Sequence, residues 1–92
     1  MANVIITIKI MPADTDTDLE ALEQKILAII KQLTGETETR TVIEPVAFGL
    51  KSLKITYVTD EKKGSTEPVE KAIAELEEVN SAEVVDVRRA VG

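Results

Sequence analysis

Two kinds of apolar spacing alternate along the 92-residue chain, and their order restricts the folds open to it. Segments 4–11, 53–58 and 82–89 place apolar residues at every second position, which is typical of strands with one buried face. Segment 39–46, rich in Thr, Val and Ile, indicates a further strand. In segments 19–33 and 69–79 apolar residues recur three or four apart, as on the buried face of a helix. We therefore predict the order strand, helix, strand, strand, helix, strand.

This order predicts an α+β fold, a ferredoxin-like β-α-β-β-α-β sandwich with two helices on one face of a four-stranded antiparallel sheet. Packing both helices on one face buries every apolar stripe at once, and right-handed crossovers then fix the arrangement. No linker rich in Pro, Ser or Gly divides residues 1–92, so we expect a single domain. The outer sheet face, which carries Thr, Lys and Val, is left for solvent or a partner.

The first helix carries clear signals at both of its ends. Thr17, followed three residues later by Glu20, matches a capping box, and Gly35 is a typical stop. Its predicted inner face is Leu19, Leu22, Ile26, Ile29 and Leu33.

The second helix and the strands carry weaker signals. We expect Ser65 or Thr66 to cap this helix and Asn80 and Ser81 to end it. Its predicted inner stripe is Val69, Ala72, Ile73, Leu76 and Val79. Val85 and Val87 should point inward from the last strand.

The second and third strands each contain an irregularity. Because Pro45 cannot donate a ladder hydrogen bond, we expect the second strand to be an edge or to end there. Leu50 is out of step with the third strand, so we expect a bulge or bend between Gly49 and Ser52.

Composition excludes several classes of function. The net charge of −6 disfavours direct binding to nucleic acid, whose phosphates require clustered Lys and Arg, and favours a basic protein surface. The chain has neither His nor Cys, so the commonest general base and the thiol nucleophile are both missing. We expect no enzymatic chemistry and no cofactor. A chain without Cys, signal-peptide pattern or membrane-length apolar run is expected to be cytoplasmic.

The acidic segment DTDTD, residues 14–18, resembles the opening of a calcium-binding loop. Counted from Asp14, however, Leu19 stands where the loop requires Gly, and Lys25 stands where it requires Glu. We therefore expect no metal site here. The segment is interpreted as a solvated acidic loop that caps a helix.

Phe48, the only phenylalanine, poses the main question about function. A large apolar side chain is usually buried, which favours packing in the core. Its position between Pro45 and Gly49 instead suits an exposed anchor that fills a partner's pocket. The pattern of residues leaves both alternatives open.

Basic residues near this hairpin and near the chain end are the other candidates. Lys51 and Lys54 lie three apart on one strand, so they should point to opposite faces of the sheet. Arg88 and Arg89 are adjacent on the last strand, so at most one should contact a given partner. Solubility alone is a competing explanation for both arginines.

Three stretches resemble the archaeal elongation factor 1-beta family and the exchange domain of its eukaryotic counterpart. PVAFGLKSLKI, starting at Pro45, is similar to the family block P-[VI]-x-[FY]-G-[IL]-K-x-L. DTDTDLEALE is similar to its acidic lead-in to the first helix, and VTDEKKGSTEPVEKAI to the polar turn before the second. The first block is fairly specific, and the three occur in the family's order.

The resemblance implies a guanine nucleotide exchange factor in translation elongation and protein biosynthesis. Its partner would be elongation factor 1-alpha, the GTPase that delivers aminoacyl-tRNA. Phe48 matches the aromatic residue that the family pushes into the GTPase near its switch region, so the resemblance favours the exposed anchor. The residues expected to bind this partner are Phe48, Gly49, Lys51, Arg88 and Arg89.

The chain departs from the eukaryotic members at its end. They carry a lysine next to the last residue, thought to disturb the magnesium site of the GTPase, whereas this chain has Val91 there. Either Arg88 or Arg89 substitutes for that lysine, or exchange proceeds without a basic group in the metal site.

An alternative is a small-molecule-binding or assembly module of the same fold without catalysis, since this fold hosts many functions. Metal-chaperone members require a CxxC motif, which the chain lacks. RNA-recognition members stack bases on sheet aromatics, and only Tyr57 is offered here. Binding to the elongation GTPase would separate the two hypotheses; the oligomeric state is left open.

Overall fold

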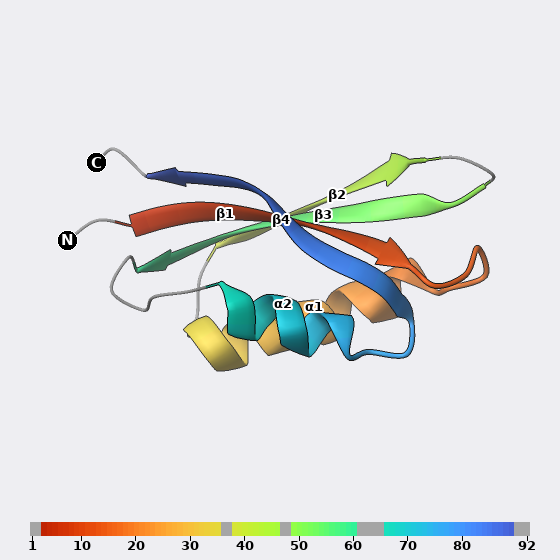
Figure 1. Ribbon diagram of the computed structural model, residues 1–92, viewed down its shortest axis with the longest axis horizontal. Coiled ribbons are helices and arrows are strands. Elements are labelled where there is room, and N and C mark those ends of the chain that lie inside the picture. Colours follow the sequence, from red (N-terminus) through yellow and green to blue (C-terminus); the bar gives the residue numbers. More distant parts are fainter. Residues whose placement is uncertain (1–2, 36–37, 47–48, 61–65, 90–92) are drawn as a thin grey trace.

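A computed structural model describes residues 3–35, 38–46, 49–60 and 66–89 and confirms the predicted fold. Its elements are β1 (Asn3–Pro12), α1 (Leu19–Thr34), β2 (Thr39–Pro45), β3 (Lys51–Asp60), α2 (Glu67–Ala74) and β4 (Val79–Arg89). The strands form one antiparallel sheet in the order β2-β3-β1-β4, and β2 is an edge, as predicted. Both helices cover the same face of the sheet (Figure 1).

The core lies between the two central strands and the helices. From Ile6 along β1 and from Leu53 to Tyr57 along β3, every second side chain is buried, as the alternating pattern predicts. Ser52, next to Leu53, is buried as well. The strands contribute Ile6, Ile8, Ile10, Leu53, Ile55 and Tyr57, and the helices contribute Leu22, Ile26, Ile30, Val69 and Ile73. This apolar layer fixes the two central strands, and the strands in turn hold the loops at their ends in place.

The N-terminus of α1 is capped by Asp18, so the predicted capping box at Thr17 is wrong. The Asp18 carboxylate accepts hydrogen bonds from the backbone N–H groups of Glu20 and Ala21, at 3.1 and 3.2 Å. A negative charge in this position also interacts favourably with the helix dipole. Gly35 ends the helix with φ 88°, as expected.

The inner face of α1 differs from the prediction in its last turns. Leu22 and Ile26 are buried as predicted, but the stripe continues to Ile30, and Leu33 is exposed. The i+4 spacing from Leu22 through Ile30 keeps these side chains on the face toward the sheet.

The second helix is shorter than predicted, because α2 ends at Ala74 and not near Asn80. Two tight turns follow, in which Leu76 and Val79 donate backbone hydrogen bonds to residues three positions earlier. Val79 is buried as the first residue of β4 instead of belonging to the helix. Thr66 occupies the N-cap position, but its hydroxyl donates to the Glu70 carboxylate at 2.9 Å. Ser65 lies outside the described residues.

The last strand contains two register shifts that the sequence did not predict. Thr7 pairs with Asp86 and Ile8 with Val84, which leaves Val85 as an extra residue in β4. Ala82 and Val84 therefore pack against the core, whereas Val85 and Val87 are exposed, at 44% and 56%. Val85 and Val87 are therefore not buried as predicted. Val85 is the extra residue of the bulge, whereas Val87 pairs with Ile6 and so lies on the predicted helix-side face of the sheet, although it is exposed.

The expected irregularity between Gly49 and Ser52 is a bend and not a bulge. Gly49 adopts φ 79°, and Val46 N–H donates to Leu50 C=O at 2.8 Å. From Lys51 onward, β3 pairs with β1 and β2 without a register shift. Leu50 is out of step because it precedes the strand.

Candidate functional site

The β2–β3 hairpin positions the first group of predicted binding residues. The hydrogen bond between Val46 and Leu50 closes a three-residue connection, 47–49, whose last residue is Gly49. A glycine with positive φ at the end of such a connection is a common hairpin geometry, because a side chain there is strained. Phe48 itself lies outside the described residues, so its exposure stays a prediction.

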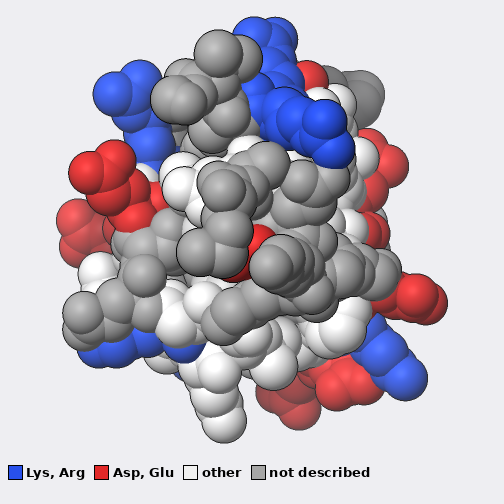
Figure 2. Space-filling view, turned by 90° about the vertical axis from the view of Figure 1, so that its left-hand side faces the viewer, with Lys and Arg blue, Asp and Glu red and all other residues white. Residues whose placement is uncertain are grey.

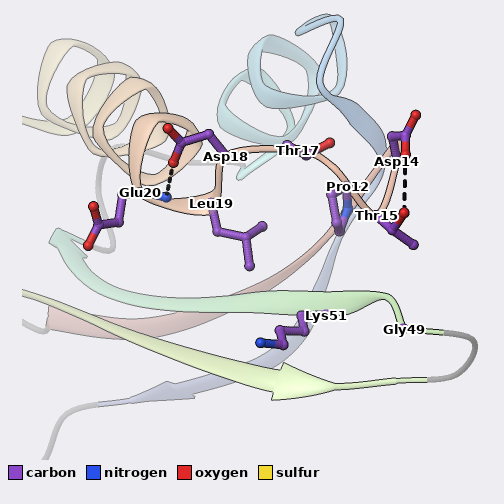
Figure 3. Close-up of a pocket in the computed structure, with 9 residues that line it drawn as sticks. All are labelled: Pro12, Asp14, Thr15, Thr17, Asp18, Leu19, Glu20, Gly49 and Lys51. Carbon is purple, nitrogen blue, oxygen red and sulfur yellow. Dashed lines mark hydrogen bonds between the residues drawn. The ribbon is translucent and has the colours of Figure 1, made fainter.

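The hairpin end lies beside the loop that joins β1 to α1. Ile10 pairs with Leu53 in the antiparallel ladder, so the end of β1 and the start of β3 meet at the same edge of the molecule. Together they border a groove (Figure 3). Its lining residues are Pro12, Asp14, Thr15, Thr17, Asp18, Leu19, Glu20, Gly49 and Lys51.

Acidic side chains dominate this groove, with one lysine opposite them. Asp14, Asp18 and Glu20 come from the β1–α1 loop and the start of α1, and Lys51 comes from β3 (Figure 3). Their charges give the groove a negative character that suits a basic protein surface.

Two of these carboxylates also have structural roles. Asp18 caps α1, and Asp14 accepts a hydrogen bond from the Asp16 backbone N–H at 3.1 Å. The interpretation of DTDTD as an acidic loop that caps a helix is therefore confirmed for Asp18. Among residues 3–35, 38–46, 49–60 and 66–89, the structure has no cluster of three or more potential metal ligands from His, Cys, Asp and Glu.

The two lysines of β3 point to opposite faces, as predicted. Lys51 shares the helix-side face with Leu53, whereas Lys54 lies on the outer face. The Lys54 ammonium forms an ion pair with the Glu44 carboxylate at 3.1 Å. Lys51 is therefore the lysine on the side of the groove.

The arginines of β4 lie at the other end of the sheet. Arg88 pairs with Ile5 and Arg89 with Val4, so they occupy opposite faces beside the start of β1. The Arg88 guanidinium forms an ion pair with Asp86 at 2.8 Å. Viewed onto this end, Lys and Arg side chains gather along the upper rim, with Asp and Glu on both flanks (Figure 2).

The structure therefore does not bring the predicted binding residues into one site. Val4, which pairs with Arg89, and Pro12, which borders the groove, are separated by most of β1. At about 3.3 Å per residue, that separation is about 26 Å. Gly49 and Lys51 form one group, and Arg88 and Arg89 form another at the far end of the sheet.

The sequence prediction omitted the loop side of the groove, including Thr15 and Leu19. A usable signal was present, because the acidic segment directly follows the first strand and the Phe48 block directly precedes the third. In the predicted fold these strands are antiparallel neighbours, so both segments must lie at the same end of the sheet.

Comparison with known proteins gives a matching family and similar full-length proteins. The family described as EF-1 guanine nucleotide exchange domain matches residues 5–90. Elongation factor 1-beta of Methanosphaera stadtmanae is 43% identical over 89 residues, which cover 97% of this chain and 98% of that protein. Elongation factor 1-beta of Methanosarcina barkeri is also 43% identical over 89 residues, covering 97% of this chain and 99% of that protein.

Among solved structures, the de novo designed protein Foldit4 superposes with a TM-score of 0.64 at 19% identity, over 98% of both chains. That likeness concerns the fold alone. In the part of the chain that the structure describes, neither helix has the length and apolar character needed to cross a membrane.

The fold and the strand order define a ferredoxin-like α+β protein. Within that class, the chain belongs to the family of EF-1 guanine nucleotide exchange domains.

Proposed function

We propose that this protein promotes GDP release from the translation elongation GTPase elongation factor 1-alpha, by binding it directly. The observation that carries the proposal is the family match over residues 5–90, supported by relatives that align over nearly their whole length. Direct contact with nucleic acid is not part of the proposal, since the net charge of −6 opposes it.

The physical basis of exchange is reciprocal linkage. A protein that binds the nucleotide-free GTPase more tightly than the GDP-bound form must weaken GDP binding by the same factor. Bound magnesium and the loops around it hold the nucleotide phosphates, so displacing those contacts releases GDP. No bond is made or broken by the exchange factor in this process.

The groove end is the surface we assign to the GTPase switch region. Gly49 and Lys51 project from the same hairpin as Phe48, and the acidic β1–α1 loop lies alongside. An apolar anchor surrounded by charged groups is a common arrangement for a protein interface. In this proposal Phe48 supplies the anchor and Lys51 a rim charge.

One of the two arginines Arg88 and Arg89, which lie on opposite faces of the sheet, is assigned to a second contact with the same GTPase. About 26 Å of β1 separates them from the groove, so they would touch a different part of a larger partner. Either the switch-region contact alone drives exchange, or one of these arginines contributes from the far end.

The test is calorimetric binding of the protein to elongation factor 1-alpha in its nucleotide-free and GDP–magnesium forms. We expect tighter binding to the nucleotide-free form, by the same factor as the loss of GDP affinity. Equal affinity for both forms would contradict the exchange function.

A matched pair of variants tests which face of the sheet contacts the GTPase. Lys51→Ala should weaken binding, whereas Lys54→Ala, which removes the same charge from the opposite face of β3, should not. If Lys54→Ala weakened binding and Lys51→Ala did not, the GTPase would instead contact the outer face of the sheet.

A further inference from the structure

The groove beside the hairpin contains two charged side chains that make no ion pair within the described part of the chain. Of the four charged residues that line it, Asp14 and Asp18 have their carboxylates engaged by backbone N–H groups of the loop and of α1. Among the described residues, none forms an ion pair with the Glu20 carboxylate or with the Lys51 ammonium. Both side chains are exposed, so a partner can pair with them without breaking an internal ion pair.

The two side chains belong to opposite walls of the groove. Glu20 lies in the first turn of α1, and Lys51 is the first residue of β3. Leu19 projects from α1 toward the sheet between them (Figure 3). The groove, with a volume of about 440 Å³, therefore has a negative wall, an apolar centre and a positive wall.

The apolar centre is held in place by the fold. Leu19 directly follows Asp18, whose carboxylate caps α1, and it packs against the core while staying partly exposed. A surface that is already ordered in the free protein loses little conformational entropy when a partner covers it.

We infer that Glu20 and Lys51 together determine the direction in which a surface segment of the GTPase enters the groove. A basic side chain of that segment pairs with Glu20, an acidic one pairs with Lys51, and an apolar one between them covers Leu19. The reversed segment is disfavoured because it would bring like charges together at both walls. The inference rests on the proposed function, since it takes elongation factor 1-alpha as the partner, and it adds Glu20 and Leu19 to the residues that recognise this partner.

Neutralising one wall tests the electrostatic role of Glu20. Charges at the rim of an interface act mainly on the association rate, and salt screens them. Glu20→Gln keeps the shape of the side chain, so it should lower the association rate constant with nucleotide-free elongation factor 1-alpha by about threefold in low salt. The difference should vanish in about 1 M salt, where the Debye length is only about 3 Å. A loss that is independent of salt would mean that Glu20 supports the structure only.

Exchanging the charges tests whether each residue has its own partner on the GTPase. Glu20→Lys and Lys51→Glu should each weaken binding by about tenfold, and the variant with both substitutions by about 100-fold, because both walls then meet like charges. If the two residues acted only on each other, the double variant would instead regain the original affinity. Such recovery, or unchanged binding by either single variant, would overturn the inference.

A matched control excludes a general effect of net charge. Glu75, exposed at the end of α2, does not border the groove, so Glu75→Gln and Glu75→Lys make the same charge changes elsewhere. Both should bind as the original chain does. Because a lysine at position 20 opposes the dipole of α1, thermal unfolding checks that each variant is folded.

The original chain is measured first, which separates this inference from the function on which it rests. If it does not bind nucleotide-free elongation factor 1-alpha, the proposed function and the inference both fail. If it binds and accelerates GDP release while the Glu20 variants match the Glu75 controls, only the inference is overturned.

Discussion

Gly49 of the β2–β3 hairpin lies against Thr15 of the β1–α1 loop. A Cβ atom added at Gly49 would come to 3.9 Å from Thr15 Cγ2, an ordinary van der Waals distance. The space around Gly49 would therefore accept a methyl group. What requires glycine is the backbone, whose φ of 79° is unfavourable for other residues. The two segments that border the groove are thus close neighbours, held there by the ends of β1 and β3.

Gly49→Ala should destabilise the protein through backbone strain. We expect a loss of about 1–2 kcal/mol in the free energy of unfolding, the cost of a left-handed conformation for a residue with a Cβ. Gly49→Asn should lose less, because asparagine tolerates this region better. Urea unfolding measures both. Equal losses would point to a steric cause instead.

Replacing the helix cap should distinguish Asp18 from Thr17. Asp18→Ala removes the acceptor for the Glu20 and Ala21 N–H groups, so we expect a loss of about 1 kcal/mol. Thr17→Ala should cost much less, because Thr17 is not the cap. Thermal unfolding of the pair measures the difference, and a larger cost at Thr17 would restore the capping box that the sequence indicates.

Alkaline pH should weaken the fold through Tyr57. Burial, with a smaller effect of the Glu70 charge, raises the pKa of Tyr57 from 10 to about 12. The unfolded chain then loses this proton first, so the stability is present below pH 10 and is lost as pH rises toward 12. Because of this group, the free energy of unfolding falls by at most about 1.4 kcal/mol per pH unit.

Tyr57→Phe is the control for that slope, because lysines titrate in the same range. The variant should lose less stability between pH 10 and 12 than the original chain, as measured by urea unfolding at fixed pH. Identical slopes would mean that the phenol ionises as easily in the folded protein as in the unfolded chain.

Phe48→Ala should show whether Phe48 is an exposed anchor for the partner or a residue of the core. For an anchor, nucleotide exchange should fall by about 30-fold, equivalent to about 2 kcal/mol. The free energy of unfolding should change by less than about 0.5 kcal/mol. Val46→Ala, an exposed apolar residue of the same hairpin, is the matched control and should affect neither. Severe destabilisation by Phe48→Ala would show that Phe48 packs in the core.

Much of the fold was predictable because β1 and β3 keep strict alternation along their buried faces. Ile6, Ile8 and Ile10 are buried as the pattern requires, as are their partners on β3. The wrong predictions lie where the spacing of apolar residues is compatible with two different structures. Leu76 and Val79 suit either a longer helix or the turns that follow Ala74. The bulge at Val85 depends on how β4 pairs with β1, which the spacing within one strand does not reveal.

The position of the groove could be predicted from the sequence, although the predicted residues omitted its loop side. The hairpin block and the acidic segment stand out in the sequence, and the topology places both at one end of the sheet. The same topology places Arg88 and Arg89 at the other end of the sheet, so they form a group separate from Gly49 and Lys51. Phe48 and Val91, which carry the resemblance and the departure from it, both lie outside the described residues.

The most direct test of the central claim is the release of a fluorescent GDP analogue from elongation factor 1-alpha, followed in time with excess unlabelled GDP. Protein added at a small fraction of the GTPase concentration should accelerate release of the whole bound population, because each exchange factor is used repeatedly. Failure of the folded protein to accelerate release from a folded, GDP-loaded elongation factor 1-alpha would contradict the proposed function.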